Sequence, residues 1–239
     1  MPDWTRFNIQ LSLQSLRSYN SAVVQKELRK LHLRWWHAGV TSMATILKAA
    51  GIHSNVLSRI SEIIKNCREC RVWAASGNTT IPTLSPPDQF NQHGVVDLMF
   101  YRTYIVFHLI DRCTRWHAGS IIDNKEEATL LDAIHGNWIS IFGAMQKLYS
   151  DGESGLTSGN AKQHFIRQGI ELKIRAPEQH ARHIERYGAI LRVCMHITEE
   201  QYKREGIEIS IKMLLAQCLF MGNSLTSVGS STPYQAVMG

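Results

Sequence analysis

The chain is organised around the stretch Gly94-Val95-Val96-Asp97-Leu98-Met99-Phe100-Tyr101, an apolar run with one carboxylate in its middle. Successive side chains of a strand point to opposite faces, so Val95 and Met99 share one face with Asp97. Both faces are apolar, which predicts a strand covered on both sides. An unpaired carboxylate there is costly, and no Lys or Arg occupies a neighbouring position. Asp97 is therefore a hydrogen-bonded strand-end residue, the partner of a distant cation, or a metal ligand.

The composition sets the broad class of the protein. At 239 residues, with 44% hydrophobic and 19% charged residues, the chain is one large domain or two small ones with ample core. Residues 1–75 carry eleven Lys or Arg against four Asp or Glu, and residues 76–239 carry fifteen against sixteen. A basic amino-terminal third indicates a polyanion as partner.

The sequence shows neither an apolar run that could span a bilayer nor a signal peptide. Its five Cys are spread thinly and do not suggest a disulfide framework. We therefore expect a soluble, intracellular protein that is not secreted and has no membrane partner.

Apolar spacing predicts three short helices in the amino-terminal part: residues 21–34, a second helix capped by Thr41 and closed by Gly51, and a third capped by Asn55. Helices this short bury little surface, so a metal that holds them together is physically reasonable. Residues 1–21 stay unassigned, and the helical domain spans residues 22–72.

Two histidines and two cysteines accompany these helices. His32 and His37 enclose four residues, and the pair Cys67 and Cys70 follows after 29 more. Two imidazoles and two thiolates suit tetrahedral zinc. The alternative is an accidental Cys-x-x-Cys with surface histidines. We predict one structural Zn²⁺ held by these four side chains.

A linker with Pro82, Pro86 and Pro87 is expected at residues 73–92, ahead of a second domain at residues 93–239. Strands are expected at 95–101, 103–112, 115–122, 146–150 and 170–175, and helices at 125–142, 158–168, 185–203 and 208–222. Three antiparallel strands followed by crossovers predict an α/β fold, a ribonuclease H-like core with a five-stranded mixed sheet flanked by helices.

Three carboxylates converge in this predicted sheet. Asp97 lies in the first strand, and Asp151 lies at the carboxyl end of the fourth, where open α/β sheets place their sites. Glu185 follows thirty-four positions after Asp151, at the start of a helix. Three carboxylates at one point repel one another unless divalent cations bridge them, so we expect two Mg²⁺ or Mn²⁺ there.

At this point the chain resembles a retroviral or retrotransposon integrase. The two ligand sets occur in the family's order, and the resemblance covers about residues 22–239. Three short sequence words match as well: Ser150-Asp151-Gly152-Glu153, Glu185-Arg186 and Thr232-Pro233-Tyr234-Gln235-Ala236-Val237.

The resemblance implies DNA 3′-end processing and strand transfer by a homo-multimer on double-stranded DNA, both element ends and target. Asp97 and Asp151 would bridge the two catalytic metals, and Glu185 would hold the second. The place of action would be the nucleus or a retroelement particle.

Cations for phosphate contacts are expected at residues 162–192, which carry seven Lys or Arg against three Glu. Solvated surface charge is the alternative for each of them. The candidates are Lys162, Lys173, Arg175, Arg182 and Arg186.

The chain departs from the family pattern in two ways. The gap between Asp151 and Glu185 is shorter than usual, which leaves Glu178, directly after Pro177, as a rival. No carboxy-terminal DNA-binding domain follows Gly239, so we expect a polyprotein segment or a decayed copy. Two other functions therefore stay open: an inactive nucleic-acid-binding remnant, and a plain ribonuclease H-like nuclease, against which the zinc module argues.

Overall fold

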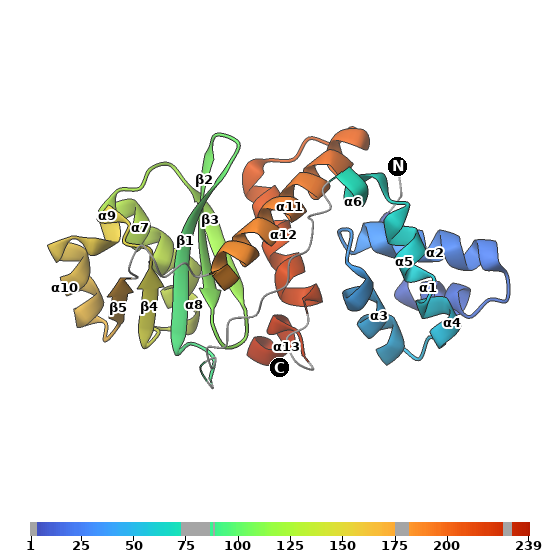
Figure 1. Cartoon of the computed structure of the whole chain (residues 1–239), viewed down its shortest axis with the longest axis horizontal. Coiled ribbons are helices and arrows are strands. Elements are labelled where there is room, and N and C mark those ends of the chain that lie inside the picture. Colours follow the sequence, from blue (N-terminus) through green and yellow to red (C-terminus); the bar gives the residue numbers. More distant parts are fainter. Residues whose placement is uncertain (1–3, 73–86, 88, 175–181, 227–230) are drawn as a thin grey trace. The chain divides into compact units, whose positions relative to one another are not determined.

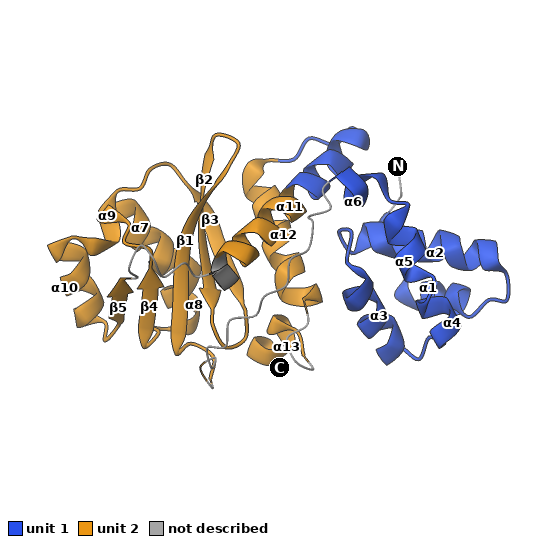
Figure 2. Ribbon diagram, in the orientation of Figure 1, with its two compact units in different colours: residues 1–77, 196–209 blue, residues 78–195, 210–239 orange. Residues whose placement is uncertain are grey.

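The computed structural model describes residues 4–72, 87, 89–174, 182–226 and 231–239. The chain forms two compact units, shown in Figure 2. Unit 1 consists of residues 1–77 and 196–209, and unit 2 consists of residues 78–195 and 210–239. Residues 93–239 were expected to form one domain, whereas the structure groups the short segment 196–209 with the amino-terminal unit.

Unit 1 is helical, and its core consists of aliphatic side chains such as Leu16, Leu28 and Leu47, each at most 1% exposed. Helix α2 has the predicted bounds and is capped by Asn20, which accepts from the Ala22 amide at 2.9 Å. The elements are η1 (Trp4–Arg6), α1 (Ile9–Leu16), α2 (Ser21–Arg34), α3 (Val40–Ala49), α4 (Ser54–Leu57), α5 (Ile60–Lys65) and α6 (Arg68–Val72), followed much later by the end of α11.

Two helix starts in unit 1 were predicted wrongly. Helix α3 begins after Gly39 rather than at a Thr41 cap. The expected third helix is split into α4 and α5, with His53 as the N-cap of α4. Ser58 Oγ donates to the Asn55 carbonyl at 2.9 Å, so a side chain takes a backbone acceptor at the break, as serine often does near helix ends.

Unit 2 is built on a five-stranded mixed sheet with the order β3-β2-β1-β4-β5, which confirms the predicted fold class. Strand β1 pairs antiparallel with β2 and parallel with β4, while β3 and β5 complete the two edges. The strands are β1 (His93–Tyr101), β2 (Tyr104–Asp111), β3 (His117–Ile122), β4 (Lys147–Ser150) and β5 (Glu171–Ile174).

Helices lie on both faces of the sheet (Figure 1). On one face, Val96, Leu109 and Leu148 share a buried core with Trp138 and Phe165. On the other face α12 contacts β3. The helices of this unit are α7 (Glu127–Ile134), a π-helical turn η2 (His135–Ile139), α8 (Ser140–Phe142), α9 (Ser154–Thr157), α10 (Gly159–Arg167), α11 (Arg182–Arg204, which ends in unit 1), α12 (Ile211–Leu225) and α13 (Pro233–Met238).

The helix expected at 125–142 contains a π-helical turn that the apolar spacing did not reveal. Asn137 Nδ2 donates to the Ala133 carbonyl at 2.8 Å and to Ser120 Oγ at 2.9 Å. The side chain thus occupies the carbonyl that an α-helix would offer to the Asn137 amide, which favours the wider turn.

Candidate metal centres

The two histidines and two cysteines predicted to hold zinc come together in unit 1, with their ligand atoms within 4.8 Å of one another. His37 Nδ1 lies 3.2 Å from His32 Nε2, and the sulfur–nitrogen distances are 3.3, 3.3 and 3.6 Å. A tetrahedral zinc site with ordinary bond lengths places N and N about 3.3 Å apart, and N and S about 3.6 Å apart. The donor set therefore fits one zinc ion.

The backbone at the end of α2 turns His37 toward His32. The amide of His37 donates to the His32 carbonyl at 2.8 Å. Trp36 and His37 have φ of 46° and 59°, a left-handed conformation that is uncommon for residues other than glycine. Such strain persists only where surrounding contacts fix it, and it is frequent at functional sites.

Each histidine also engages its second ring nitrogen, as histidine ligands of metals commonly do. His32 Nδ1 lies 3.2 Å from the Ala38 carbonyl, so it carries the proton and leaves Nε2 to the metal. His37 Nε2 lies 2.9 Å from Gln201 Oε1, so it carries the proton and leaves Nδ1 to the metal. The two rings would therefore coordinate a metal through different nitrogens.

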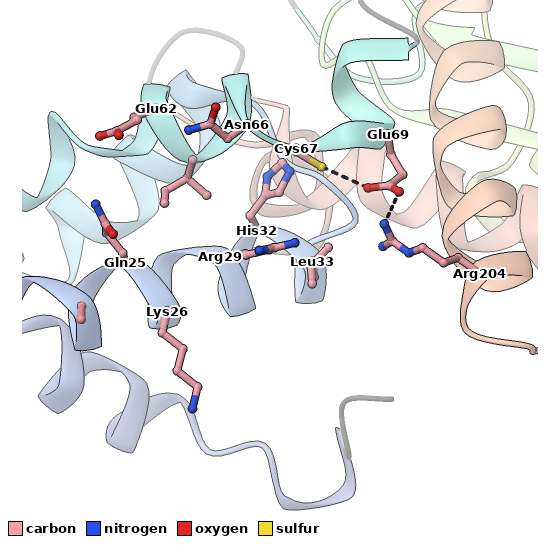
Figure 3. A pocket seen from close by; sticks show the side chains of 12 residues that line it. Gln25, Lys26, Arg29, His32, Leu33, Glu62, Asn66, Cys67, Glu69 and Arg204 are labelled. Atoms are coloured by element: carbon pink, nitrogen blue, oxygen red, sulfur yellow. Dashed lines mark hydrogen bonds and ion pairs between the residues drawn. The ribbon is translucent and has the colours of Figure 1, made fainter.

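A carboxylate lies beside the first cysteine (Figure 3). Cys67 Sγ is 3.3 Å from Glu69 Oε2, and Arg204 donates to the other oxygen of this buried Glu69. The hydrogen bond with Cys70 lowers the pKa of the Cys67 thiol well below its usual range; burial opposes this, while hydrogen bonds with His32 and His37 assist it. A thiol with a low pKa is readily available as the thiolate that a metal requires.

The two aspartates of the predicted catalytic site lie at matched positions of neighbouring strands. The parallel register pairs His93 with Lys147 and Val95 with Tyr149. Continued by two residues, it sets Asp97 opposite Asp151, which directly follows β4. Adjacent strands are about 4.8 Å apart, so this continued register would bring the two residues close together.

The glycine after Asp151 explains how β4 ends there. Gly152 has φ of 87°, which glycine adopts without steric cost, and a Cβ on it would lie 3.3 Å from a methyl carbon of Ile174. The Asp151-Gly152 pair therefore turns the chain away from the sheet directly after β4.

Helix α11, whose first turn contains Glu185, passes close to Asp97. A Cβ placed on Gly188 would lie 3.6 Å from Asp97 Oδ2, so this helix runs directly over Asp97. Glu185 lies in the first turn of α11, three residues before Gly188 and hence on the same side of the helix. Glu185 and Asp151 are exposed and Asp97 is partly buried. The roles of these three residues stay a prediction, and the rival Glu178 lies outside the described residues.

No family model and no curated protein sequence matches the chain. Solved structures do match it. A chain in the simian T-cell lymphotropic virus intasome in complex with PP2A regulatory subunit B56 gamma aligns with a TM-score of 0.64 and 15% identity, over 89% of this chain and 72% of that one.

Isolated catalytic cores match as well. The HTLV-2 integrase catalytic core domain in complex with magnesium aligns with a TM-score of 0.52 and 14% identity, over 62% of this chain and 96% of that one. The BIV integrase catalytic core domain gives 0.53 and 15%, over 62% and 94%. The chain has the fold of a retroviral integrase catalytic core. At such low identity the likeness is one of fold, and it agrees with the family resemblance seen in the sequence.

The cations expected to contact DNA around this integrase fold are placed unequally. Lys162 on α10 and Arg186 on α11 are exposed. Lys173 is also exposed, but it forms an ion pair with Glu171 at 2.5 Å, and this hydrogen bond raises its pKa. Arg175 lies outside the described residues, and of Arg182 only the backbone, the first residue of α11, is described.

Two further histidines of the integrase-like sheet are structural. His108 Nε2 and His117 Nδ1 are 2.9 Å apart, and both rings are buried. Burial lowers the pKa of His117 to about 4, with Arg115 acting in the same direction, and burial followed by the charge of His117 lowers the pKa of His108. Both are neutral at pH 7. They are core residues, not part of a second metal site.

Three residues beside the four candidate zinc ligands were not predicted from the sequence: Glu69, Gln201 and Arg204. Glu69 could have been noticed because it lies inside the Cys-x-x-Cys motif. The other two are separated from the motif by more than 130 residues, as the 135-residue spacing of Glu69 and Arg204 shows, and no local pattern marks them.

Proposed function

We propose that the chain is an integrase-type polynucleotidyl transferase, which processes DNA 3′ ends and transfers them into target DNA in a reaction that depends on Mg²⁺ or Mn²⁺. The observation that carries this proposal is the meeting of Asp97, Asp151 and α11 in one region of the sheet. Three carboxylates gathered in one region would suit two divalent cations, which offset the repulsion between them.

Asp97 and Asp151 would hold both cations between them, and Glu185 would hold the second. Cations bound there supply Lewis-acid activation of the nucleophile, a water or a DNA 3′-hydroxyl, and stabilisation of the leaving oxygen. The contribution of the protein is to fix the carboxylates: β1 and β4 set the spacing of the two aspartates, and α11 sets the position of Glu185. The displacement is in line and needs no covalent enzyme intermediate.

The partners in this proposal are double-stranded DNA and further copies of the chain. The neighbours with the same fold include a viral intasome and catalytic cores in dimeric and trimeric forms. Lys162, Arg182 and Arg186 are the proposed phosphate contacts. We also propose one structural zinc ion in unit 1. None of the helices in the described part of the chain has the length and apolar character needed to cross a membrane. We place the reaction inside the cell, in the nucleus or in a retroelement particle.

The test is strand transfer by the purified chain with Mg²⁺ or Mn²⁺ and short duplexes that carry element ends. We expect Asp151→Asn and Glu185→Gln to lower the rate by orders of magnitude, because each change removes a charge that holds a cation. DNA binding without divalent cations should hold or rise slightly in both variants, because a negative charge facing the phosphates is lost.

Glu178→Gln is the control for the identity of the third carboxylate and should be nearly silent. An inactive Glu178→Gln beside an active Glu185→Gln would replace Glu185 by Glu178 in the site. A wild-type chain that binds zinc and DNA but never joins ends would make the protein a nucleic-acid-binding remnant, and cleavage without joining would make it a nuclease.

A further inference from the structure

The end of helix α11 contributes to the centre formed by His32, His37, Cys67 and Cys70, although it lies far away in the sequence. We infer that Gln201 is a positioning residue for the zinc ligand His37, and that residues 196–205 are an integral part of the zinc-binding unit. This inference rests on the zinc site of the proposed function, but not on any DNA chemistry.

The hydrogen-bond geometry defines the role of Gln201. Its Oε1 atom lies 2.9 Å from His37 Nε2, and its Nε2 atom donates to Glu205 Oε1 at 3.0 Å. Because Glu205 holds the amide group, the carbonyl oxygen of Gln201 faces the imidazole and accepts its proton. His37 is thereby kept in the tautomer that exposes Nδ1, the atom lying 3.2 Å from His32 Nε2 and 3.3 Å from Cys67 Sγ.

Burial makes the loss of this hydrogen bond costly. His37 is 7% exposed and Gln201 is 9% exposed, so water cannot readily replace either partner. Without Gln201 the Nε2–H group of His37 would lose its acceptor inside the unit, and the ring would lose the contact that fixes its plane. Outer partners of this kind typically change metal affinity by about 10-fold to 100-fold.

A second contact between the same elements supports the inference. Arg204, three residues after Gln201, pairs with the buried Glu69, whose other oxygen lies 3.3 Å from Cys67 Sγ. With Cys67 as a thiolate, the neighbouring carboxylate would repel it, and Arg204 compensates that charge. One turn of α11 therefore supports one histidine and one cysteine of the cluster, although this turn lies far from both of them in the sequence.

The experiment measures zinc affinity of the full-length chain by competition with a chromophoric chelator. Gln201→Leu removes the acceptor while keeping a side chain of similar size, and we expect zinc to bind about 10-fold to 100-fold more weakly. Gln14→Leu is the matched control, because Gln14 is an exposed glutamine within helix α1 of the same unit. Its zinc affinity should equal that of the wild type.

A rescue variant and a spectroscopic measurement distinguish the proposed hydrogen-bonding role of Gln201 from a role in packing alone. The double change Gln201→Glu with Glu205→Gln exchanges the carboxylate and the amide, keeps an acceptor at position 201, and should restore affinity to within a few-fold of wild type. In the zinc-loaded wild type, the Nε2–H proton of His37 should exchange slowly in nitrogen-15 NMR spectra. It should exchange fast in Gln201→Leu.

Hydrogen exchange gives an independent readout on the wild type. Removing zinc with a chelator should increase amide exchange within residues 198–205 as well as in the amino-terminal helices. Equal zinc affinity of Gln201→Leu and wild type, or unaltered exchange in 198–205, would overturn the inference and leave the zinc site intact. A wild-type chain that binds no zinc would overturn both this inference and the proposed zinc site.

Discussion

Replacing Gly188 by Ala should stabilise unit 2 and at the same time impair catalysis. Gly188 is buried in α11, and a Cβ added there lies 3.6 Å from Asp97 Oδ2, an ordinary contact distance. No backbone has to move to accept the methyl group. The substitution therefore tests the stability of the helix and the function of the Asp97 carboxylate separately.

The expected magnitude follows from two opposing terms. Alanine is better than glycine within a helix by about 0.8–1.0 kcal/mol. The methyl group also removes some water from the carboxylate of Asp97, which takes back part of that gain, so we expect the free energy of unfolding to rise by about 0.5 kcal/mol.

Catalysis should respond in the opposite direction. A divalent cation held by Asp97 would need room beside this carboxylate for itself and for the waters that complete its coordination shell. The methyl group would compete for that space. We expect the strand-transfer rate to fall at least about 10-fold, which corresponds to about 1.4 kcal/mol of transition-state stabilisation.

The assays are urea unfolding and Mg²⁺-dependent strand transfer, with Gly222→Ala as the matched control. A Cβ on Gly222 in α12 lies 3.5 Å from the His117 ring, so that variant should gain similar stability and keep full activity. Destabilisation of Gly188→Ala by about 1 kcal/mol or more would show that α11 does not lie over Asp97 as described. Full activity would show that this side of Asp97 is not where the reaction takes place.

Three other outcomes are expected. Cys67→Ser should release zinc and melt unit 1 while the strands of unit 2 keep their protection from hydrogen exchange; full zinc retention would refute the ligand assignment. The free energy of unfolding of the metal-free chain should decrease as the pH falls from about 6.5 toward 4. The reason is that His108 and His117 have a lowered pKa in the folded chain, so the unfolded chain takes up their protons at a higher pH. Each of the two can contribute up to about 1.4 kcal/mol per pH unit. Urea unfolding at several pH values measures this slope, which should be smaller in His117→Leu. DNA affinity should fall steeply with salt, since the candidate contacts are cations facing phosphates, and a flat salt dependence would contradict that.

Much of unit 2 could be predicted because its information is local. The alternation around Asp97 assigned the two faces of β1, and the short joints at residues 102–103 and 112–116 left an antiparallel meander as the simple solution. The crossovers that follow then predicted that the last two strands join the same sheet. The Asp151-Gly152 pair marked the end of β4 because only glycine adopts its backbone conformation easily.

The details that escaped prediction depend on single side chains that compete for backbone groups. Asn137 and Ser58 each take a carbonyl, and this widened one helix and interrupted another. The spacing of apolar residues cannot predict such hydrogen bonds, because the apolar residues continue at helical spacing on both sides of the irregular turn.

The candidate zinc centre shows why the surroundings of such a site are harder to predict than its ligands. Ligand type and spacing are selected by the metal itself, so His32, His37, Cys67 and Cys70 form a pattern that the sequence displays. Supporting residues only need a suitable atom in the right place, and any element that passes nearby can supply it. Here that element is α11, whose first turn carries Glu185 and whose last turns carry Gln201 and Arg204.

The two proposed centres differ in charge in a way that matches their roles. A zinc ion with two thiolates would be neutral, and Arg204 compensates the charge of Glu69. The candidate site in unit 1 would therefore have no net charge to attract a further anion. Three carboxylates with two divalent cations carry an excess positive charge instead, which favours an approaching phosphodiester. The first arrangement suits a metal that maintains a fold, and the second suits metals that bind and activate a substrate.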